Sequence, residues 1–502
     1  MKRIISSCSM FAISVGLAVL LTSNNIQSKE DRDISGDSPS YQAYESLIDS
    51  VNVLMKKYSF PGVAIALVSK DSILMSECFG FANIESNVPV TDSTLFCVGS
   101  CTKGFLGLAF LKLVDDGNVD IAMPIREIVP EIEFHNPWEK TNPVCIIHLL
   151  EHTSGFDDMH PNALYSEQNI EIPLYEALQM RPNPRTVRWQ PGTMYSYSSP
   201  GYTLAGYILE KVTGEKYEDF IKKEILDPIG MKTSALRLTD DCQRLLAVGY
   251  GDNLTPLPYI QGFDRPSSSL NSSIIDMAKF VIFLINTGSV ADKQLISKLS
   301  INLIGRPTTT LVANAGLTDG YSFGIGVRFQ DGFKWYGHSG GGPGFIAKYS
   351  YLRGHRLGYV VLANYFNPQQ FQDLCKVVQS YLIQGITPES KPSIQISNEQ
   401  LQEYAGYYEL QNSRMQLTKF LDILFNGVTI THENDTLYES EFMTDKKALI
   451  GVSKNSFRKI DDADASRIFI TNSDQGMIYA TSGSFYVKKA SWIAYILSLI
   501  HI

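Results

Sequence analysis

Ser100 and Lys103 are three residues apart at the start of a largely apolar segment, residues 104–114. Three positions make almost one turn of a helix, so the two side chains are expected on the same helical face. A serine hydroxyl becomes an effective nucleophile when a neighbouring group takes its proton, and an amine shielded from water can do this. The pair alone would also fit a serine helix cap next to a solvated lysine, so other segments decide between the two interpretations.

Two further segments carry polar side chains suited to the same chemistry. Residues 191–202 read Pro-Gly-Thr-Met-Tyr-Ser-Tyr-Ser-Ser-Pro-Gly-Tyr, and residues 337–341 read Gly-His-Ser-Gly-Gly. Together with Ser100 and Lys103, they resemble the three motifs of the serine β-lactamase and penicillin-binding protein superfamily. The resemblance is strongest for its class C-like branch of esterases, D,D-peptidases and D-aminopeptidases. Three more matches occur in the order of this family over about residues 40–385: Leu149–Phe156, Leu226–Met231 and Ser272–Phe280.

The resemblance implies acyl transfer through a covalent intermediate on Ser100, without a metal or an organic cofactor. It implies that Lys103 is the base partner and that Tyr197 passes the proton to the leaving group and helps to activate the deacylating water. We expect burial and a nearby cation or hydroxyl to hold Lys103 neutral. The Ser100 N–H, at a helix start, can donate to the oxyanion, and the resemblance places the second donor at the N–H of Gly341.

Two positions depart from the usual motifs of the family. Ser199 stands where asparagine is usual, and a hydroxyl cannot offer both the donor and the acceptor of an amide. His338, Ser339 and Gly340 occupy the positions where β-lactamases usually have Lys-Thr-Gly. Histidine, unlike lysine, is mostly neutral at pH 7. Both changes favour an esterase or peptidase over an efficient β-lactamase. Gly340 fits an edge strand where a substrate approaches the backbone.

His338 carries an expectation of its own. If it points toward the far end of the acyl donor, its protonation between about pH 8 and about pH 6 should strengthen the binding of a carboxylate-bearing substrate. The alternative is a structural histidine that is hydrogen-bonded within the sheet.

Two other catalytic motifs overlap these segments. Residues 148–152 read His-Leu-Leu-Glu-His and match the H-x-x-E-H pattern of inverted zinc proteases, with both histidines expected on one helical face. A zinc peptidase that uses His148 and His152 is therefore an alternative, although no clear third ligand is identifiable. Residues 337–341 also match G-x-S-x-G, but a nucleophile elbow leads into a helix, whereas Gly342–Gly344 and a strand follow here.

Composition and charge limit the partners of the chain. Its 502 residues carry a net charge of −9, and no dense stripe of Lys and Arg is present, which argues against nucleic acid. The expected partner is a small-molecule or peptide acyl donor, a class that includes cell-wall peptides. A catalytically weak protein that binds peptidoglycan or peptides is a further alternative, but the intact Ser100, Lys103 and Tyr197 argue against it.

The N-terminal residues predict export to the periplasm or the exterior. Lys2 and Arg3 precede an apolar stretch, Met10–Leu21, that is too short to span a bilayer and is typical of a secretory signal. If this signal stays uncleaved, it would anchor the chain to a membrane instead. The apolar tail at residues 491–502 is a second segment through which the chain could associate with a membrane.

The remaining pattern predicts an α+β fold. Hairpins on both sides of residues 120–330, which read as an all-helical lobe with long loops, predict one antiparallel sheet flanked by helices. This agrees with the β-lactamase/transpeptidase-like fold that the resemblance implies. The strands expected in this sheet are residues 63–68, 73–75, 333–338, 345–352 and 357–364.

We predict four segments: a signal peptide at residues 1–28, a β-lactamase-like hydrolase domain at 29–385, a C-terminal β-domain at 386–490 and the tail at 491–502. The β-domain, a meander or barrel, resembles the lipocalin-like appendage of some members of the family. Because all three motifs precede it, we expect residues 29–385 to hydrolyse a small ester alone. The whole chain is predicted to be an exported serine hydrolase that acts on an ester, a D-amino-acid peptide or a β-lactam-like amide. The strands expected in the β-domain include residues 423–425, 428–431, 448–452, 467–471 and 477–480.

Overall fold

The computed structural model describes residues 41–158, 172–180, 185–260, 262–388, 392–472 and 475–489. The chain divides into two units, Met1–Ser46 and Leu47–Ile502. Of the first unit, the structure describes only the beginning of helix α2 (Tyr41–Tyr58). The expected signal peptide and the apolar tail at residues 491–502 lie outside the described residues. Within the described ranges, no helix combines the length and the apolar character needed to cross a membrane.

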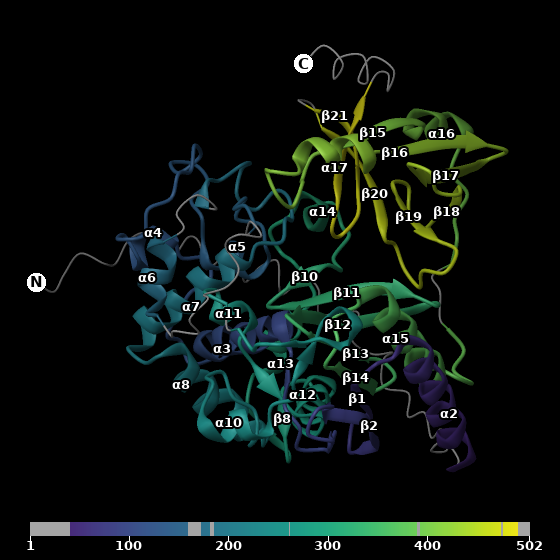
Figure 1. Cartoon of the computed structure of the whole chain (residues 1–502). Helices are drawn as coiled ribbons and strands as arrows, with labels where there is room; N and C mark the ends of the chain where they lie inside the picture. Colours follow the sequence, from purple (N-terminus) through teal and green to yellow (C-terminus); the bar gives the residue numbers. More distant parts are fainter. Residues whose placement is uncertain are drawn as a thin grey trace, which may run out of the picture. The chain divides into compact units, whose positions relative to one another are not determined.

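An antiparallel sheet of eight strands forms the centre of the larger domain (Figure 1). In spatial order its strands are β10 (Tyr321–Ser322), β11 (Ile325–Gln330), β12 (Phe333–Gly342), β13 (Phe345–Leu352), β14 (Leu357–Ala363), β1 (Gly62–Ser69), β2 (Ile73–Asn83) and β3 (Val88–Pro89). The early and late strands meet where β1 pairs with β14, from Val63 opposite Ala363 to Ser69 opposite Leu357. The predicted sheet, completed by both ends of the domain, is thus confirmed.

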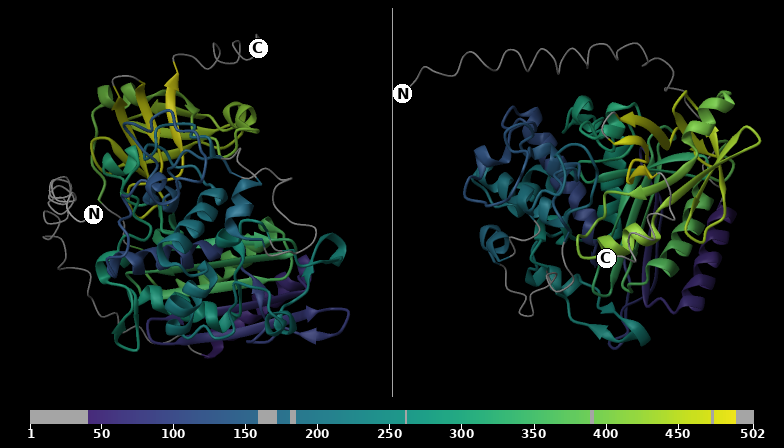
Figure 2. Two further views of the ribbon diagram at one scale, coloured as in Figure 1. Left: turned by 90° about the vertical axis from the view of Figure 1, so that its left-hand side faces the viewer. Right: turned by 90° about the horizontal axis from the view of Figure 1, so that it is seen from above.

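Helices lie against both faces of this sheet (Figures 1 and 2). Helix α12 (Ile274–Ile285) packs on β1, β13 and β14, and α15 (Pro368–Leu382) packs on β13 and β14. Ala64 of β1 joins the buried core that includes α12, while its neighbour Ile65, which points to the opposite face, is equally buried. Cover on both faces explains why β1 is apolar at nearly every position.

The segment between the two halves of the sheet is mostly helical, as predicted. The prediction of an all-helical lobe is wrong at the C-terminal end of this segment, because β10 and β11 lie within residues 120–330 but belong to the sheet. The sequence of β11 explains why this part forms a strand. Its apolar residues Ile325, Val327 and Phe329 alternate with Gly and polar residues, which is the two-residue period of a strand. The helices of this segment are α4 (Ile125–Ile128), α5 (Ile146–Leu150), α6 (Leu174–Gln179), α7 (Ser199–Thr213), α8 (Tyr217–Ile221), η4 (Lys222–Leu226), α9 (Asp227–Ile229), α10 (Asp240–Leu245), η5 (Asp252–Leu254), α11 (Arg265–Ser268), α13 (Lys298–Ile301) and α14 (Leu311–Asn314). Three short strand pairs accompany them: β4 (Phe96–Cys97) with β7 (Asn271–Ser272), β5 (Gly249–Tyr250) with β6 (Pro256–Leu257), and β8 (Ser289–Val290) with β9 (Lys293–Gln294).

The C-terminal domain is a closed antiparallel barrel of eight strands. They are β15 (Gly406–Leu410), β16 (Val428–Glu433), β17 (Thr436–Glu441), β18 (Lys447–Gly451), β19 (Ser456–Lys459), β20 (Arg467–Asn472), β21 (Gly476–Ala480) and β22 (Phe485–Lys489), and helices α16 (Asn398–Tyr404) and α17 (Lys419–Phe425) accompany them. Each strand pairs with the next, and β22 returns to β15. The predicted α+β fold with a small all-β domain is confirmed.

One predicted strand of the barrel is wrong. Residues 423–425 lie in α17, because three consecutive apolar residues cannot distinguish a strand from part of a short helix. The other four expected strands coincide with β16, β18, β20 and β21 to within two residues at each end.

The two domains share a buried apolar cluster. It combines Val312 and Leu317, in and just after α14, with Ile478 of β21 and Phe485 of β22. Each of these side chains is at most 6% exposed, so the surface that they cover would meet water if the barrel were removed.

Candidate active site

Ser100 lies in the turn η1 (Gly99–Cys101), directly before the buried helix α3 (Thr102–Asp115). This turn packs tightly against strand β12. A Cβ atom on Gly340 would lie only 2.0 Å from the Val98 carbonyl oxygen and 2.5 Å from the Ser100 amide nitrogen. One on Gly99, whose φ is +50°, would lie 2.5 Å from the Gly341 nitrogen. Glycine alone permits this approach, which brings together the two predicted oxyanion donors, the N–H groups of Ser100 and Gly341.

Lys103 follows one helical turn later, and its side chain is fully buried. The Nζ atom lies 3.2 Å from Ser100 Oγ, 3.3 Å from Ser199 Oγ and 3.1 Å from the carbonyl oxygen of Ser267. The predicted sharing of one face by Ser100 and Lys103 is therefore observed, and the amine is within hydrogen-bonding distance of the proposed nucleophile.

Two opposing effects determine the protonation of Lys103: burial favours the neutral amine, and nearby carboxylates favour the ammonium form. Burial lowers the pKa of Lys103 from its usual 10.5 to about 8, although the carboxylates of Asp264 and Asp158 favour the charged form. A substantial fraction of the amine is thus neutral at mildly alkaline pH, and this fraction can accept the proton of Ser100.

Tyr197 lies beside the buried lysine. The centre of its ring is 4.8 Å from Lys103 Nζ. Burial raises the pKa of Tyr197 above its usual range, and a hydrogen bond with Ser100 acts in the opposite direction. The phenol therefore keeps its proton at neutral pH, so it can both donate and accept, which suits a relay better than a first base.

His152 supports the Tyr197 segment. Its Nδ1 accepts a hydrogen bond from the Ser198 N–H at 3.0 Å, and its carbonyl oxygen accepts one from the Ser196 N–H at 2.7 Å. The ring centre lies 4.3 Å from that of Tyr197. Burial holds the pKa of His152 well below its usual value, so the ring is neutral and carries its proton on Nε2. Sequence analysis did not assign this role, although the residue lies in one of the matched segments.

The zinc-protease interpretation of residues 148–152 does not fit the structure. Helix α5 ends at Leu150, and His152 adopts a φ of +57°. The prediction that the two histidines share a helical face is therefore wrong. His148 Nδ1 accepts a hydrogen bond from the Cys145 N–H, and the Glu151 carboxylate accepts bonds from the backbone and hydroxyls of residues 308–309. The described residues contain no group of three His, Cys, Asp or Glu side chains placed to hold a metal ion.

Ser199, predicted to bind substrate, is placed against the base. It begins helix α7, its Oγ is 3.3 Å from Lys103 Nζ, and its N–H donates to Asp158 Oδ1 at 2.9 Å. The residue is only 8% exposed. This position favours a role in holding Lys103.

The third motif lies on β12. The Nδ1 atom of His338 is 2.5 Å from the Ser339 carbonyl oxygen, and its Nε2 is 3.1 Å from the Tyr321 hydroxyl. Because a carbonyl only accepts, Nδ1 carries the proton and Nε2 accepts from Tyr321. Burial, reinforced by the nearby Lys103, lowers the pKa of His338 to about 3. The expected protonation between pH 8 and pH 6 is therefore not supported, and the structural alternative describes this histidine.

The same segment is not a nucleophile elbow. Ser339 is exposed on β12, which continues to Gly342 and turns into β13 rather than into a helix. The strand places Gly340 and Gly341 against the nucleophile turn instead.

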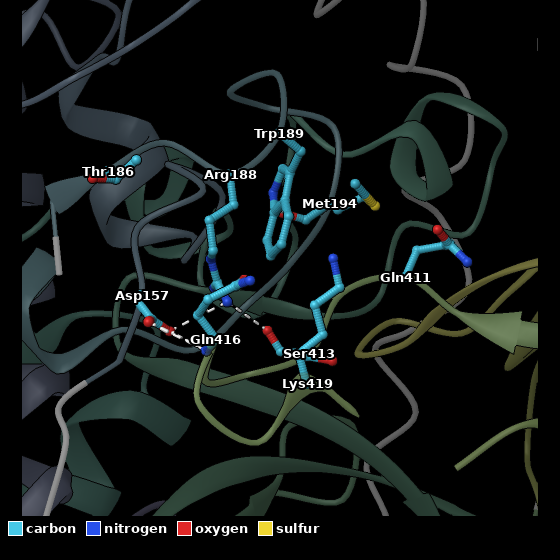
Figure 3. Close-up of a pocket in the computed structure, with 9 residues that line it drawn as sticks. All are labelled: Asp157, Thr186, Arg188, Trp189, Met194, Gln411, Ser413, Gln416 and Lys419. Atoms are coloured by element: carbon cyan, nitrogen blue, oxygen red, sulfur yellow. Dashed lines mark hydrogen bonds and ion pairs between the residues drawn. The ribbon is translucent and has the colours of Figure 1, made fainter. Parts of the chain in front are cut away.

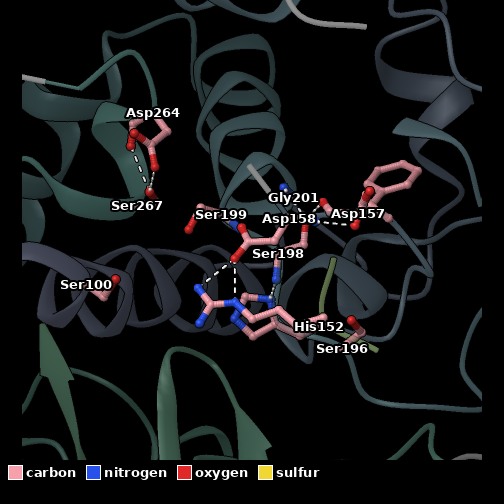
Figure 4. Close-up of polar contacts among 12 residues, drawn as sticks. Ser100, His152, Asp157, Asp158, Ser196, Ser198, Ser199, Gly201, Asp264 and Ser267 are labelled. Atoms are coloured by element: carbon pink, nitrogen blue, oxygen red, sulfur yellow. Dashed lines mark hydrogen bonds and ion pairs between the residues drawn. The ribbon is translucent and has the colours of Figure 1, made fainter. Parts of the chain in front are cut away.

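Three charged residues that sequence analysis did not single out surround the Ser100–Lys103–Tyr197 cluster. Asp264 is buried and accepts a hydrogen bond from Ser267 (Figure 4). The carbonyl oxygen of Ser267 contacts Lys103. Asp158 lies beside Ser199 in the same view. Arg414 comes from the barrel and pairs with Asp158 at 2.6 Å. None of the three lies in a motif with recognisable spacing, so the sequence offers no signal for them.

A cavity of about 630 Å³ adjoins this region. Its lining is mixed, polar and apolar, and comes from both domains: Arg188 and Trp189 belong to the segment before Tyr197, and Gln416 and Lys419 to the C-terminal domain (Figure 3). Its complete lining is Asp157, Thr186, Arg188, Trp189, Met194, Gln411, Ser413, Gln416 and Lys419.

Comparison with known proteins agrees with this fold. Residues 47–379 match the beta-lactamase family, and the chain belongs to that family. It is 26% identical over 332 residues to a D-aminopeptidase of Gluconobacter oxydans (strain 621H), which covers 64% of this chain and 59% of the relative. It is also 26% identical over 275 residues to protein flp of Staphylococcus aureus (strain N315), covering 53% of this chain and 54% of the relative. The chain thus spans little more than half the length of these relatives.

Solved structures share the fold. An octameric penicillin-binding protein homologue from Pyrococcus abyssi aligns with a TM-score of 0.58 at 22% identity and covers 89% of this chain and all of that one. A structure of SurE aligns with the same TM-score at 17% identity and covers 89% of this chain and 99% of that one. The family match over residues 47–379 makes the chain a member of the serine β-lactamase and penicillin-binding protein superfamily, and these structures agree with its fold.

Proposed function

We propose that this protein is a serine hydrolase that transfers an acyl group to water through an acyl-enzyme on Ser100. The observation that carries the proposal is the contact between Lys103 and Ser100, in which a buried amine with a lowered pKa lies 3.2 Å from the hydroxyl oxygen. A lysine with an ordinary pKa would be protonated and could not act as the base.

The reaction follows from this arrangement. Ser100 Oγ attacks the carbonyl carbon while its proton passes to Lys103, and the resulting oxyanion accepts hydrogen bonds from the N–H groups of Ser100 and Gly341. Collapse breaks the bond to the leaving group, which receives the proton through the Tyr197 phenol. Water then attacks the acyl-enzyme, gives up a proton to the same pair of side chains, and releases the acid and the free Ser100 hydroxyl.

We further propose an ester or a D-amino-acid peptide as the acyl donor. A D-aminopeptidase is among the relatives of the chain. The third motif carries a neutral His338 in place of a lysine, which weakens capture of the carboxylate that β-lactams bear. Cell-wall peptides fall within this class of acyl donors, and export to the compartment that contains them, expected from the predicted N-terminal signal, is part of the proposal.

Mass spectrometry of the intact protein tests the reaction. Incubation with a fluorophosphonate should add one phosphonyl group, and peptide mapping should place it on Ser100. The Ser100→Ala variant should remain unlabelled and should not hydrolyse a chromogenic ester, whereas Ser339→Ala, which alters the exposed serine of the third motif, should still be labelled. Labelling of Ser339, or ester hydrolysis that persists in Ser100→Ala, would refute the proposal. A parallel incubation with a penicillin distinguishes a β-lactam acyl donor from the other two.

A further inference from the structure

The barrel inserts one of its loops into the neighbourhood of the catalytic cluster. This loop, residues 411–418, joins β15 to α17. Its Asn412 side chain donates a hydrogen bond to the Tyr195 carbonyl oxygen at 2.5 Å. The Ser413 carbonyl oxygen accepts one from Arg188 at 2.8 Å and one from the Ser196 hydroxyl at 3.4 Å. The loop is thus fixed to the backbone just before Tyr197.

Arg414 extends from this loop to the catalytic groups themselves. Its Nε and Nη2 atoms both lie 2.6 Å from Asp158 Oδ2. The guanidinium carbon lies 4.7 Å from the centre of the Tyr197 ring. Arg414 is 60% exposed, whereas the Asp158 side chain is 5% exposed.

Asp158 connects this arginine to the base. Its second oxygen, Oδ1, accepts the Ser199 N–H at 2.9 Å, and Ser199 Oγ is 3.3 Å from Lys103 Nζ. A buried carboxylate so close to an amine would favour the ammonium form if nothing balanced its charge. An ammonium has no free electron pair with which to accept a proton.

We propose that Arg414 is a positioning residue that balances the charge of Asp158, so that the barrel supplies the condition under which Lys103 acts as a base. The inference rests on the proposed function. Removal of the guanidinium would take away the cation paired with Asp158 and leave Arg188 as a remaining positive charge that acts on this carboxylate. The lysine would then hold its proton to a higher pH.

Other charged or titratable groups also face Lys103, but all of them come from the larger domain. Asp264 acts in the same direction as Asp158, whereas His152 and His338 are neutral and add no charge. Arg414, by contrast, is a charged group that the barrel brings close to Lys103. The described groups near Lys103 include Cys101, His152, Asp158, Tyr197, Tyr202, Asp264, His338 and Arg414.

The pH dependence of Ser100 labelling by a fluorophosphonate tests the proposal on the full-length chain. The second-order labelling rate should rise with pH as Lys103 loses its proton. In Arg414→Gln the midpoint of this rise should move up by about one pH unit, the lower end of the effect of one close charge. Arg414→Lys should keep the midpoint within a few tenths of a unit, because it keeps the positive charge. Lys446→Gln is the matched control, since it removes one positive charge from a lysine paired with Glu433 on the barrel surface.

A second pair of variants separates charge from structure. Asp158→Asn should move the midpoint down, and the double variant with Arg414→Gln should return it toward the wild-type value, because both charges are then gone. An unchanged midpoint in a folded Arg414→Gln protein, even with a lower rate at every pH, would overturn the inference and leave Ser100 catalysis intact. If Arg414→Gln does not fold, an unchanged midpoint in Asp158→Asn would overturn it equally. Absence of Ser100 labelling in the wild-type protein would instead refute the proposed function and this inference together.

Discussion

A single added methyl group at Gly340 should disable the oxyanion site. In Gly340→Ala the new Cβ atom would lie 2.0 Å from the Val98 carbonyl oxygen and 2.5 Å from the Ser100 nitrogen, and both are backbone atoms. Ordinary contact begins at 3.4 Å, so the strand and the nucleophile turn must separate by about 1.4 Å. An oxyanion donor works at roughly 2.7–3.1 Å from the developing charge, and a displacement of this size removes one donor.

The expected loss in kcat is therefore about 10²–10³-fold, which corresponds to roughly 3–4 kcal/mol of transition-state stabilisation. Hydrolysis of a chromogenic ester measures this loss, and near-ultraviolet circular dichroism with a thermal melt shows whether the variant is folded. Gly342→Ala is the matched control on the same strand, because its Cβ would meet only Cys97 Sγ at 3.6 Å. A folded Gly340→Ala protein with near-wild-type kcat, or an equal loss in Gly342→Ala, would refute the reasoning.

Three further predictions concern the protonation of the site. The kcat/KM of the wild-type protein should rise with pH along a limb whose apparent pKa is about 8, because Lys103 accepts a proton only when it is neutral; a rate that is flat from pH 6 to pH 9 would contradict this. Lys103→Ala and Tyr197→Phe should each reduce kcat by about 10²–10⁴-fold. The double variant should lose far less than the product of the two single losses, since the residues act as a unit. Losses that multiply in the double variant would argue against the relay. Affinity for a carboxylate-bearing ester and for a neutral ester should depend on pH in the same way between pH 6 and pH 8, because the lowered pKa of His338 keeps this ring neutral over the interval; a selective gain for the anionic ester at pH 6 would show that the histidine protonates there.

The sequence was sufficient to predict the architecture and the cluster at its centre. The spacing of Ser100 and Lys103 predicted a shared helical face, and the alternating pattern of residues 345–352 predicted a strand with the bounds observed for β13. Such predictions succeed because they depend on local periodicity, which the chain carries in every element.

The residues that tune the site could not be predicted in this way. Asp158 and Arg414 are 256 positions apart and meet only after the barrel has closed. His152 has a left-handed backbone conformation, so residues 148–152 do not form the predicted helical turn. The sequence pattern of these residues does not indicate this conformation. The charge of His338 depends on burial by neighbours that are distant in sequence, and the usual pKa of an isolated histidine does not include this effect. Long-range contacts and burial are properties of the fold, and short motifs do not encode them.

The closure of the barrel determines when the loop that carries Arg414 is fixed in place during folding. The loop that carries Arg414 is held from its other side by the last described strand: Gln411 N–H donates to the Phe485 carbonyl oxygen, and the Asn412 side chain bonds to Gly483 and to the Phe485 N–H. These partners are among the last parts of the described chain to leave the ribosome. Ser100, Lys103 and Tyr197 are synthesised hundreds of residues earlier, but the guanidinium that balances Asp158 is secured only when β22 pairs with β15. A chain in which β22 has not yet paired would therefore hold Ser100 and Lys103 without this fixed guanidinium, and Lys103 would keep its proton to a higher pH until the barrel closes.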